Sequence, residues 1–150
     1  MKKLFIVAFI GVIIFISGCY RPQIDTFTIE DLVSNFVSSI REESSENLSS
    51  LHTFPLELKR ISGETATFHT WDHFNLTVAA MFVVYEFHLA NLVDYSYTIN
   101  GSIAEVNIEI YLEAYSKLDS REIKKELKMF WKARLTDDGW KIFYEEETYN

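Results

Sequence analysis

The residues best suited to acid–base chemistry lie between positions 69 and 88. Asp72 and His73 are adjacent and follow His69, and His88 comes further along the chain. A carboxylate beside an imidazole is a common pair for moving protons near neutral pH, where histidine titrates. The alternative, which we favour, is that Asp72 is stabilised by a helix dipole beside an exposed His73. The weak catalytic candidates are therefore Asp72, His73 and His88.

The same part of the chain gives little support for a metal site. His69 and His73 could both ligate a metal, but no third ligand follows at a recognisable spacing. Cys19 is the one cysteine, so neither an intrachain disulfide nor a cysteine-based zinc site can form. We predict that His52 lies on a surface loop. We therefore predict no metal and no cofactor, and the sequence weighs against an enzyme.

Aromatic side chains with polar tips form a second set of candidates, together with His88. They could line a pocket for an amphipathic ligand, or they could simply fill the interior of the domain, which we favour. The possible lining residues are Tyr85, His88, Tyr95, Tyr97, Trp131, Trp140 and Tyr144.

A long hairpin over residues 102–136 must position these side chains. Even positions from Ala104 to Ala114 are apolar, as are most odd positions from Ile123 to Leu135, and this period of two predicts two half-buried strands. A slip of four residues would keep the charges on their outer faces matched, so charge alone does not fix the register. A turn at Leu118 and Asp119 predicts the pairs Glu113 with Lys124, Glu109 with Lys128 and Glu105 with Lys132.

Helical patterns precede this hairpin. Thr28, with Asp31 three residues later, predicts the start of an amphipathic helix. Weaker patterns predict a short helix before Pro55, a helical turn over 56–61 and a short strand over 64–69. Thr70 begins the strongest helical pattern, whose apolar stripe carries Phe74, Val78, Met81, Phe82, Tyr85, Leu89 and Leu92.

Two further strands flank the central hairpin. Residues 93–99 alternate, and a two-residue turn at Asn100 and Gly101 would set Tyr97 opposite Ala104. A turn over 137–139 leads into a last strand, after which residues 145–150 form a polar tail. The side chains of Trp140, Ile142 and Tyr144 would point inward from that strand. The pattern predicts an α+β domain, with helices on one face of a curved antiparallel meander of four strands or slightly more.

The first twenty residues carry a targeting signal. A basic start precedes an apolar run, Leu4–Ile16, that is too short to span a bilayer. The run ends in Ile16-Ser17-Gly18-Cys19, which resembles the lipobox of a bacterial lipoprotein. The resemblance implies cleavage before Cys19, its lipidation and acylation, and stable anchoring outside the cytoplasm. We therefore expect a signal peptide at 1–18, a lipidated cysteine and tether at 19–27, and one domain at 28–150.

Composition and charge restrict the possible partners. The 150 residues are 48% hydrophobic, which suits one domain with a sizeable core. The formal charge is −8, and removal of Lys2 and Lys3 with the signal peptide takes −8 to −10. Such a surface repels phosphate backbones, and no basic patch with interleaved aromatic residues is present. We expect no nucleic-acid partner.

Residues 28–147 resemble the nuclear transport factor 2-like superfamily, a cone-shaped, cystatin-like roll. The likeness rests on element order, on the long central strands and on the ending, where Phe130-Trp131-Lys132-Ala133-Arg134-Leu135 precedes Asp138-Gly139-Trp140-Lys141-Ile142. It implies that any pocket lies between the long helix and the concave sheet face. Members of the superfamily often dimerise through the outer face, which allows a dimer here without requiring one. Enzymes of that superfamily place a carboxylate, or an aspartate–histidine pair, in the pocket. Here the inward positions of the hairpin carry no carboxylate, and their one ionisable group is Lys125.

Three functions remain open at this point. The leading hypothesis is a non-catalytic, lipid-anchored extracytoplasmic module that binds a protein partner or assembles with itself as a homodimer. The second is a small-molecule binding protein that uses an aromatic cone. The third is a hydratase- or isomerase-like enzyme that uses Asp72, His73 or His88.

Overall fold

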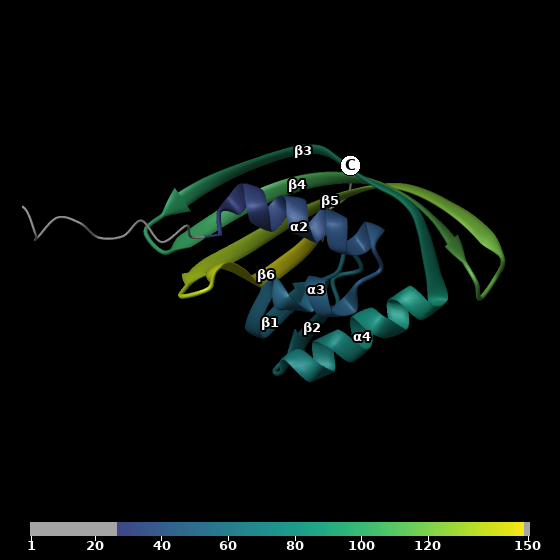
Figure 1. Ribbon diagram of the computed structural model, residues 1–150, viewed down its shortest axis with the longest axis horizontal. Helices are drawn as coiled ribbons and strands as arrows, with labels where there is room; N and C mark the ends of the chain where they lie inside the picture. The colour runs from purple at the N-terminus through teal and green to yellow at the C-terminus, as the bar shows by residue number, and fades with distance from the viewer. Residues whose placement is uncertain (1–26, 149–150) are drawn as a thin grey trace, which may run out of the picture.

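The computed structural model describes residues 27–148, which form helices on one face of a curved six-stranded sheet (Figure 1). The strand order is β2-β1-β6-β5-β4-β3; β1 pairs with β6 in parallel, and the other pairs are antiparallel. The predicted α+β class is confirmed. The elements are α2 (Ile29–Arg41), α3 (Ser45–Ser50), β1 (His52–Lys59), β2 (Thr65–Phe68), α4 (Trp71–Val84), β3 (Tyr85–Asn100), β4 (Ile103–Ser116), β5 (Arg121–Thr136) and β6 (Gly139–Thr148).

Helix α2 begins where the sequence predicts. The Thr28 side chain accepts a hydrogen bond from the Asp31 amide, and the Asp31 carboxylate accepts one from the Thr28 amide. This reciprocal capping satisfies two amides that the first turn leaves without helical partners. The helix lies across the concave face of the sheet (Figure 1). It buries Ile29, Leu32, Val33, Phe36, Val37 and Ile40.

The central hairpin has the register that a turn at Leu118 and Asp119 gives, one of the two that the charge pattern left open. Strand β4 pairs with β5 from Ile103 opposite Arg134 to Ser116 opposite Arg121, so a four-residue loop centred on Leu118 and Asp119 joins the arms. The apolar faces of both arms line the core. On the outer face, the Lys Nζ to Glu carboxylate distances are 3.5 Å for Lys124–Glu113, 3.4 Å for Lys128–Glu109 and 4.0 Å for Lys132–Glu105.

The prediction that the long helix reaches Leu92 was wrong. Helix α4 ends at Val84, and Tyr85 begins a 16-residue strand, β3. Its partner β4 is 14 residues long and pairs along its whole length, from Tyr85 opposite Ser116 to Asn100 opposite Ile103. A strand confined to residues 93–99 would have left half of β4 without that partner. Long-range pairing therefore overrode the local helical period.

The β3–β4 turn lies one residue later than predicted. Asn100 pairs with Ile103, so the turn residues are Gly101 and Ser102, and Tyr97 faces Val106 rather than Ala104. In this turn only Gly101 has a positive φ, of +63°. A type II′ turn requires glycine at its first central position, which explains the shift. The pairing moves by two residues, so apolar side chains still face apolar ones.

The prediction of a helical turn over 56–61 was also wrong. Residues His52–Lys59 form β1, which lies between β2 and β6. Leu56 is fully buried there. Pairing with two strands, one of them distant in sequence, decided the conformation. The predicted strand over 64–69 is confirmed as β2. Of the helices within residues 27–148, none is long and apolar enough to cross a membrane.

Candidate functional site

The predicted acid–base residues do not come together. Asp72 and His73 lie exposed in the first turn of α4, where the His73 amide donates to the Thr70 hydroxyl. His88 lies on β3 at a bulge, and its imidazole is more than half exposed. Its Nδ1 atom is 4.0 Å from the Glu86 carboxylate. Within residues 27–148, no three His, Cys, Asp or Glu side chains are placed to hold a metal ion.

The aromatic candidates divide between core and surface. Trp131 and Trp140 are buried, whereas Tyr95 and Tyr97 are 37% and 38% exposed. The rings of Tyr95 and Tyr97 stack with centroids 6.5 Å apart. Tyr85 is half-buried at the start of β3 and packs beside Phe87. The predicted lining residues therefore do not surround one shared pocket.

Tyr144 does not point inward as predicted. The pairing of β6 with β5 shifts by one residue between Tyr144 opposite Lys132 and Ile142 opposite Ala133. A bulge of one residue moves every later side chain to the other face. Tyr144 therefore lies on the outer face, where its ring centroid is 5.8 Å from Lys132 Nζ.

The same bulge turns Glu145 into the core, although the sequence suggested a polar tail from this residue. Glu145 lies opposite Trp131 and is 4% exposed. His52, predicted on a surface loop, is the first residue of β1 and is 6% exposed. The adjacent aromatic residues Phe143 and Tyr144 interrupt the alternation of β6. This interruption is the only local signal for the bulge.

His52 and Glu145 form a buried pair. His52 Nε2 lies 2.8 Å from Glu145 Oε1, and His52 Nδ1 lies 2.8 Å from the Leu48 carbonyl oxygen. A carbonyl oxygen only accepts, so Nδ1 carries a hydrogen. The contact between Nε2 and Oε1 needs one further hydrogen, carried by either partner. In both arrangements the pair as a whole has no net charge, which reduces the cost of burying it.

Aromatic rings cover this pair. The Phe74 ring centroid is 4.6 Å from that of His52, and Phe36 lies 6.5 Å from His52 and 4.6 Å from Trp131. Trp131 is fully buried, and its Nε1 atom has no hydrogen-bond partner among the described residues. The interior therefore holds an ionisable pair and an unpaired donor behind apolar walls.

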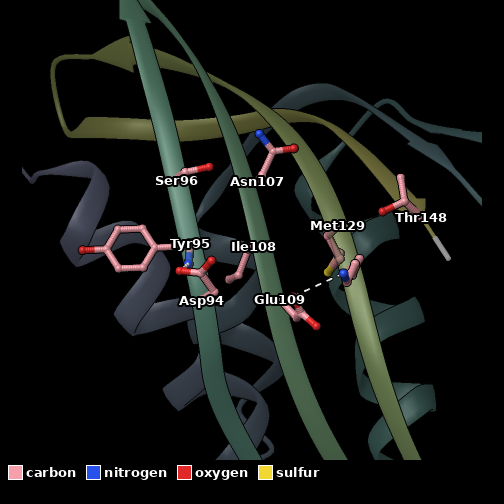
Figure 2. Close-up of a pocket in the computed structure, with 9 residues that line it drawn as sticks. Asp94, Tyr95, Ser96, Asn107, Ile108, Glu109, Met129 and Thr148 are labelled. Carbon is pink, nitrogen blue, oxygen red and sulfur yellow. Dashed lines mark hydrogen bonds and ion pairs between the residues drawn. The ribbon is translucent and has the colours of Figure 1, made fainter. Parts of the chain in front are cut away.

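A hollow on the outer face of the sheet has a volume of about 200 Å³. Figure 2 shows side chains of β3, β4, β5 and β6 around it, with the dashed line joining Glu109 to Lys128. The two charged atoms are 3.4 Å apart, as part of the ladder between β4 and β5. Most of the side chains facing this hollow are polar, and none belongs to the buried pair.

A second hollow, of about 290 Å³, lies between α2 and β3. Its apolar floor includes Val33, Val37 and Leu92. At one end the Tyr97 hydroxyl donates a hydrogen bond to the Glu30 carboxylate. This bond lowers the pKa of Glu30 and raises the pKa of Tyr97. The aromatic and apolar residues of β3 are therefore open to solvent beside α2.

Comparison with known proteins shows similarity at the level of fold. No family model matches the sequence, and no curated protein matches it. A nuclear transport factor 2-like protein from Cytophaga hutchinsonii is 19% identical, with a TM-score of 0.66 over 81% of this chain and 95% of that chain. A ketosteroid isomerase-like protein from Erwinia carotovora atroseptica is 11% identical, with a TM-score of 0.66 over 83% and 95%.

A nuclear transport factor 2-like protein from Rhodospirillum rubrum is 14% identical, with a TM-score of 0.68 over 81% of this chain and 98% of that chain. These similarities extend over nearly the whole length of each solved structure. At such low identity they establish the fold alone. The chain has the nuclear transport factor 2-like fold.

Proposed function

We propose that this chain is a lipoprotein, anchored outside the cytoplasm through Cys19, whose domain is a non-catalytic binding or interaction module. The lipobox, Ile16 to Cys19, supports the anchoring and lies outside the described residues. A tether over 19–27 would lead directly into α2. The module would therefore work close to a membrane surface.

The proposal that the module is non-catalytic rests on one observation: the His52–Glu145 pair is buried and its groups bond to other residues of the domain. A general acid or base must come within hydrogen-bond distance of its substrate. Both nitrogens of His52 are already occupied, one by Leu48 and one by Glu145. The His52 side chain has no exposed area, and that of Glu145 has 5%. A substrate would have to displace the packed rings of Phe36 and Phe74 to reach His52.

Anchoring is tested by feeding labelled palmitate to bacteria that express the full chain. We expect the wild-type protein to incorporate label and to enter the detergent phase on phase separation, because two or more acyl chains give stable membrane binding. Cys19→Ser should do neither. Ser17→Ala, which keeps a small residue before the cleavage site, should behave as wild type. Equal labelling of Cys19→Ser would contradict lipidation at this residue.

The interaction role is tested by cross-linking the full chain in intact cells with an amine-reactive reagent. We expect a defined product that contains this chain together with one further polypeptide. The product should disappear when the cells are lysed in denaturant before cross-linking. Recovery of single chains only would contradict the proposed function.

A second candidate, small-molecule binding inside the cone, is favoured by the unpaired Trp131 Nε1–H. A ligand carbonyl could accept from this donor, which is otherwise buried at a cost. The likeness to a ketosteroid isomerase-like protein points the same way. A thermal-shift screen of small carbonyl compounds tests this candidate. A ligand that stabilises the wild type but not Trp131→Phe would support it, and the absence of any shift would contradict it.

A further inference from the structure

Strand β3 is the outermost strand on one side of the sheet, and its far edge pairs with no other strand of residues 27–148 (Figure 1). It is 16 residues long, whereas β2 on the opposite side has four. A long open strand presents backbone donors and acceptors to any added strand, and short edge strands reduce this exposure. The two sides of the sheet therefore differ in their capacity to pair.

The two halves of this edge differ in the side chains that bond to their backbone groups. Near the start of β3, the Arg41 guanidinium donates to the Ala90 carbonyl at 2.8 Å, and the Glu43 carboxylate accepts from the Phe87 amide at 2.7 Å. Further along, the Tyr95 amide donates to the exposed carboxylate of its own neighbour, Asp94. Side chains from the last residue of α2 and from just after it thus bond to backbone groups of the first half, while a neighbouring side chain of β3 itself does so in the second.

The Tyr95 contact shows which residues face outward. Its amide points away from β4, and alternate residues of an antiparallel strand share this direction. The pairing with β4 runs without interruption from Asp94 to Asn100. Tyr95, Tyr97 and Ile99 therefore turn their N–H and C=O groups to the open edge. These three residues are 37%, 38% and 52% exposed.

We propose that this segment, Tyr95–Asn100, pairs antiparallel with the same segment of a second copy of the chain. This inference rests on the proposed function and names the partner of the module. With Tyr97 of each copy opposite the other, Tyr95 of one copy faces Ile99 of the second copy. Each of these pairs can exchange both backbone hydrogen bonds. The pairing joins two sheets edge to edge, and it does not use their outer faces.

Charge favours a second copy at this place. The chain carries a formal charge of −8, which in general keeps copies apart. The segment Tyr95–Asn100 contains no charged side chain, and in the register above Asp94 faces Asn100 of the second copy. Within the paired strands, no like charges are therefore brought opposite each other. Tyrosine, threonine and isoleucine also favour strand pairing.

Membrane anchoring is compatible with this arrangement. Antiparallel pairing of identical strands places a two-fold axis perpendicular to the joined sheet, so both copies keep α2 on the same side. The Tyr97 hydroxyl bonds to Glu30 in the first turn of α2, so each α2 begins beside the axis. Both tethers would therefore leave on one side, as attachment to one membrane requires.

Two exposed threonines on opposite edge strands give a matched test. The full chain carrying Thr98→Cys on β3, or Thr67→Cys on β2, is treated in host membranes with a short bismaleimide. The wild type, whose only cysteine is Cys19, sets the background. We expect Thr98→Cys to give a covalent product of two copies at about ten times the yield of Thr67→Cys, because residues diagonal across paired strands lie about 7–8 Å apart.

A second substitution separates pairing from chance collision. Tyr97→Lys in the Thr98→Cys background sets two lysines opposite each other and should lower the yield about tenfold. Tyr97→Phe loses only the bond to Glu30 and should keep the yield. Equal yields from Thr98→Cys and Thr67→Cys would overturn the inference. A Thr98→Cys product containing a different protein would also overturn it, but it would leave the interaction module standing.

Discussion

At the scale of single residues, the His52–Glu145 pair has most influence on the interior. The two residues are 93 positions apart in the sequence, and both are almost fully buried. Such a pair contributes little when it is complete, because burial offsets the attraction. Removing Glu145 leaves His52 Nε2 buried without the hydrogen bond that it now makes, although Nδ1 keeps its bond to Leu48. The pair therefore acts mainly as a constraint on the arrangement of β1 and β6.

Glu145→Ala should lower the free energy of unfolding by about 3–5 kcal/mol, because His52 Nε2 loses the one partner that it has within residues 27–148. Glu145→Gln should cost less than half as much, since its amide can still donate to Nε2 or accept from it. Urea unfolding of the full chain measures both. Glu122→Ala, at an exposed position on β5, is the control and should change stability by less than about 0.5 kcal/mol. A similarly small effect of Glu145→Ala would contradict the buried pair.

At the scale of elements, the β3–β4 turn depends on the conformation of Gly101. Gly101→Ala should destabilise the protein by about 1–2 kcal/mol, because a side chain disfavours positive φ. Apart from Gly101 and its two neighbours in the chain, no residue has an atom within 4 Å of the position of an added Cβ, so the cost is that of the backbone alone. Asn100→Ala should have a small effect. Thermal unfolding compares the stabilities of the two variants. A larger loss in Asn100→Ala than in Gly101→Ala would place the turn at Asn100 and Gly101.

The cap of α2 makes stability depend on pH. Hydrogen bonds from the Thr28 amide and hydroxyl hold the pKa of Asp31 below its ordinary value of 3.8. The folded state therefore favours the ionised carboxylate. This contribution is present above pH 3.8 and is lost as the pH falls through the lower folded pKa. Wild type should exceed Asp31→Asn in free energy of unfolding at pH 6. This difference should shrink towards pH 3, as the Asp31 carboxylate becomes protonated. A difference that does not change with pH would contradict the cap.

The elements also show what the sequence can predict. The central hairpin was predictable as two paired, half-buried strands because both arms alternate, but its register was not, since a slip of four residues keeps the apolar and the charged faces matched. The helix cap was predictable because Thr28 and Asp31 act locally. The end of α4 was not, since Tyr85, Leu89 and Leu92 fit a helical stripe until β4 is available as a partner. The buried pair was missed because His52 depends on parallel pairing with a distant strand and Glu145 depends on a bulge.

At the scale of the whole molecule, the fold separates a closed interior from an open side. Helices and the concave sheet face enclose Trp131 and the His52–Glu145 pair. Exposed apolar side chains gather on β3, among them Val93 and Ile99. This division supports a module that works through its surface. Opening of the interior would instead favour ligand binding or catalysis.

The most direct test is the rate at which diethyl pyrocarbonate modifies each histidine of the folded full-length protein, followed by mass spectrometry. The chain has four histidines; His69, His73 and His88 are exposed, and His52 is buried. The three exposed histidines should react readily, while His52 should react only after unfolding. Modification of His52 in the folded protein as fast as the other three would show an open interior and contradict the non-catalytic module.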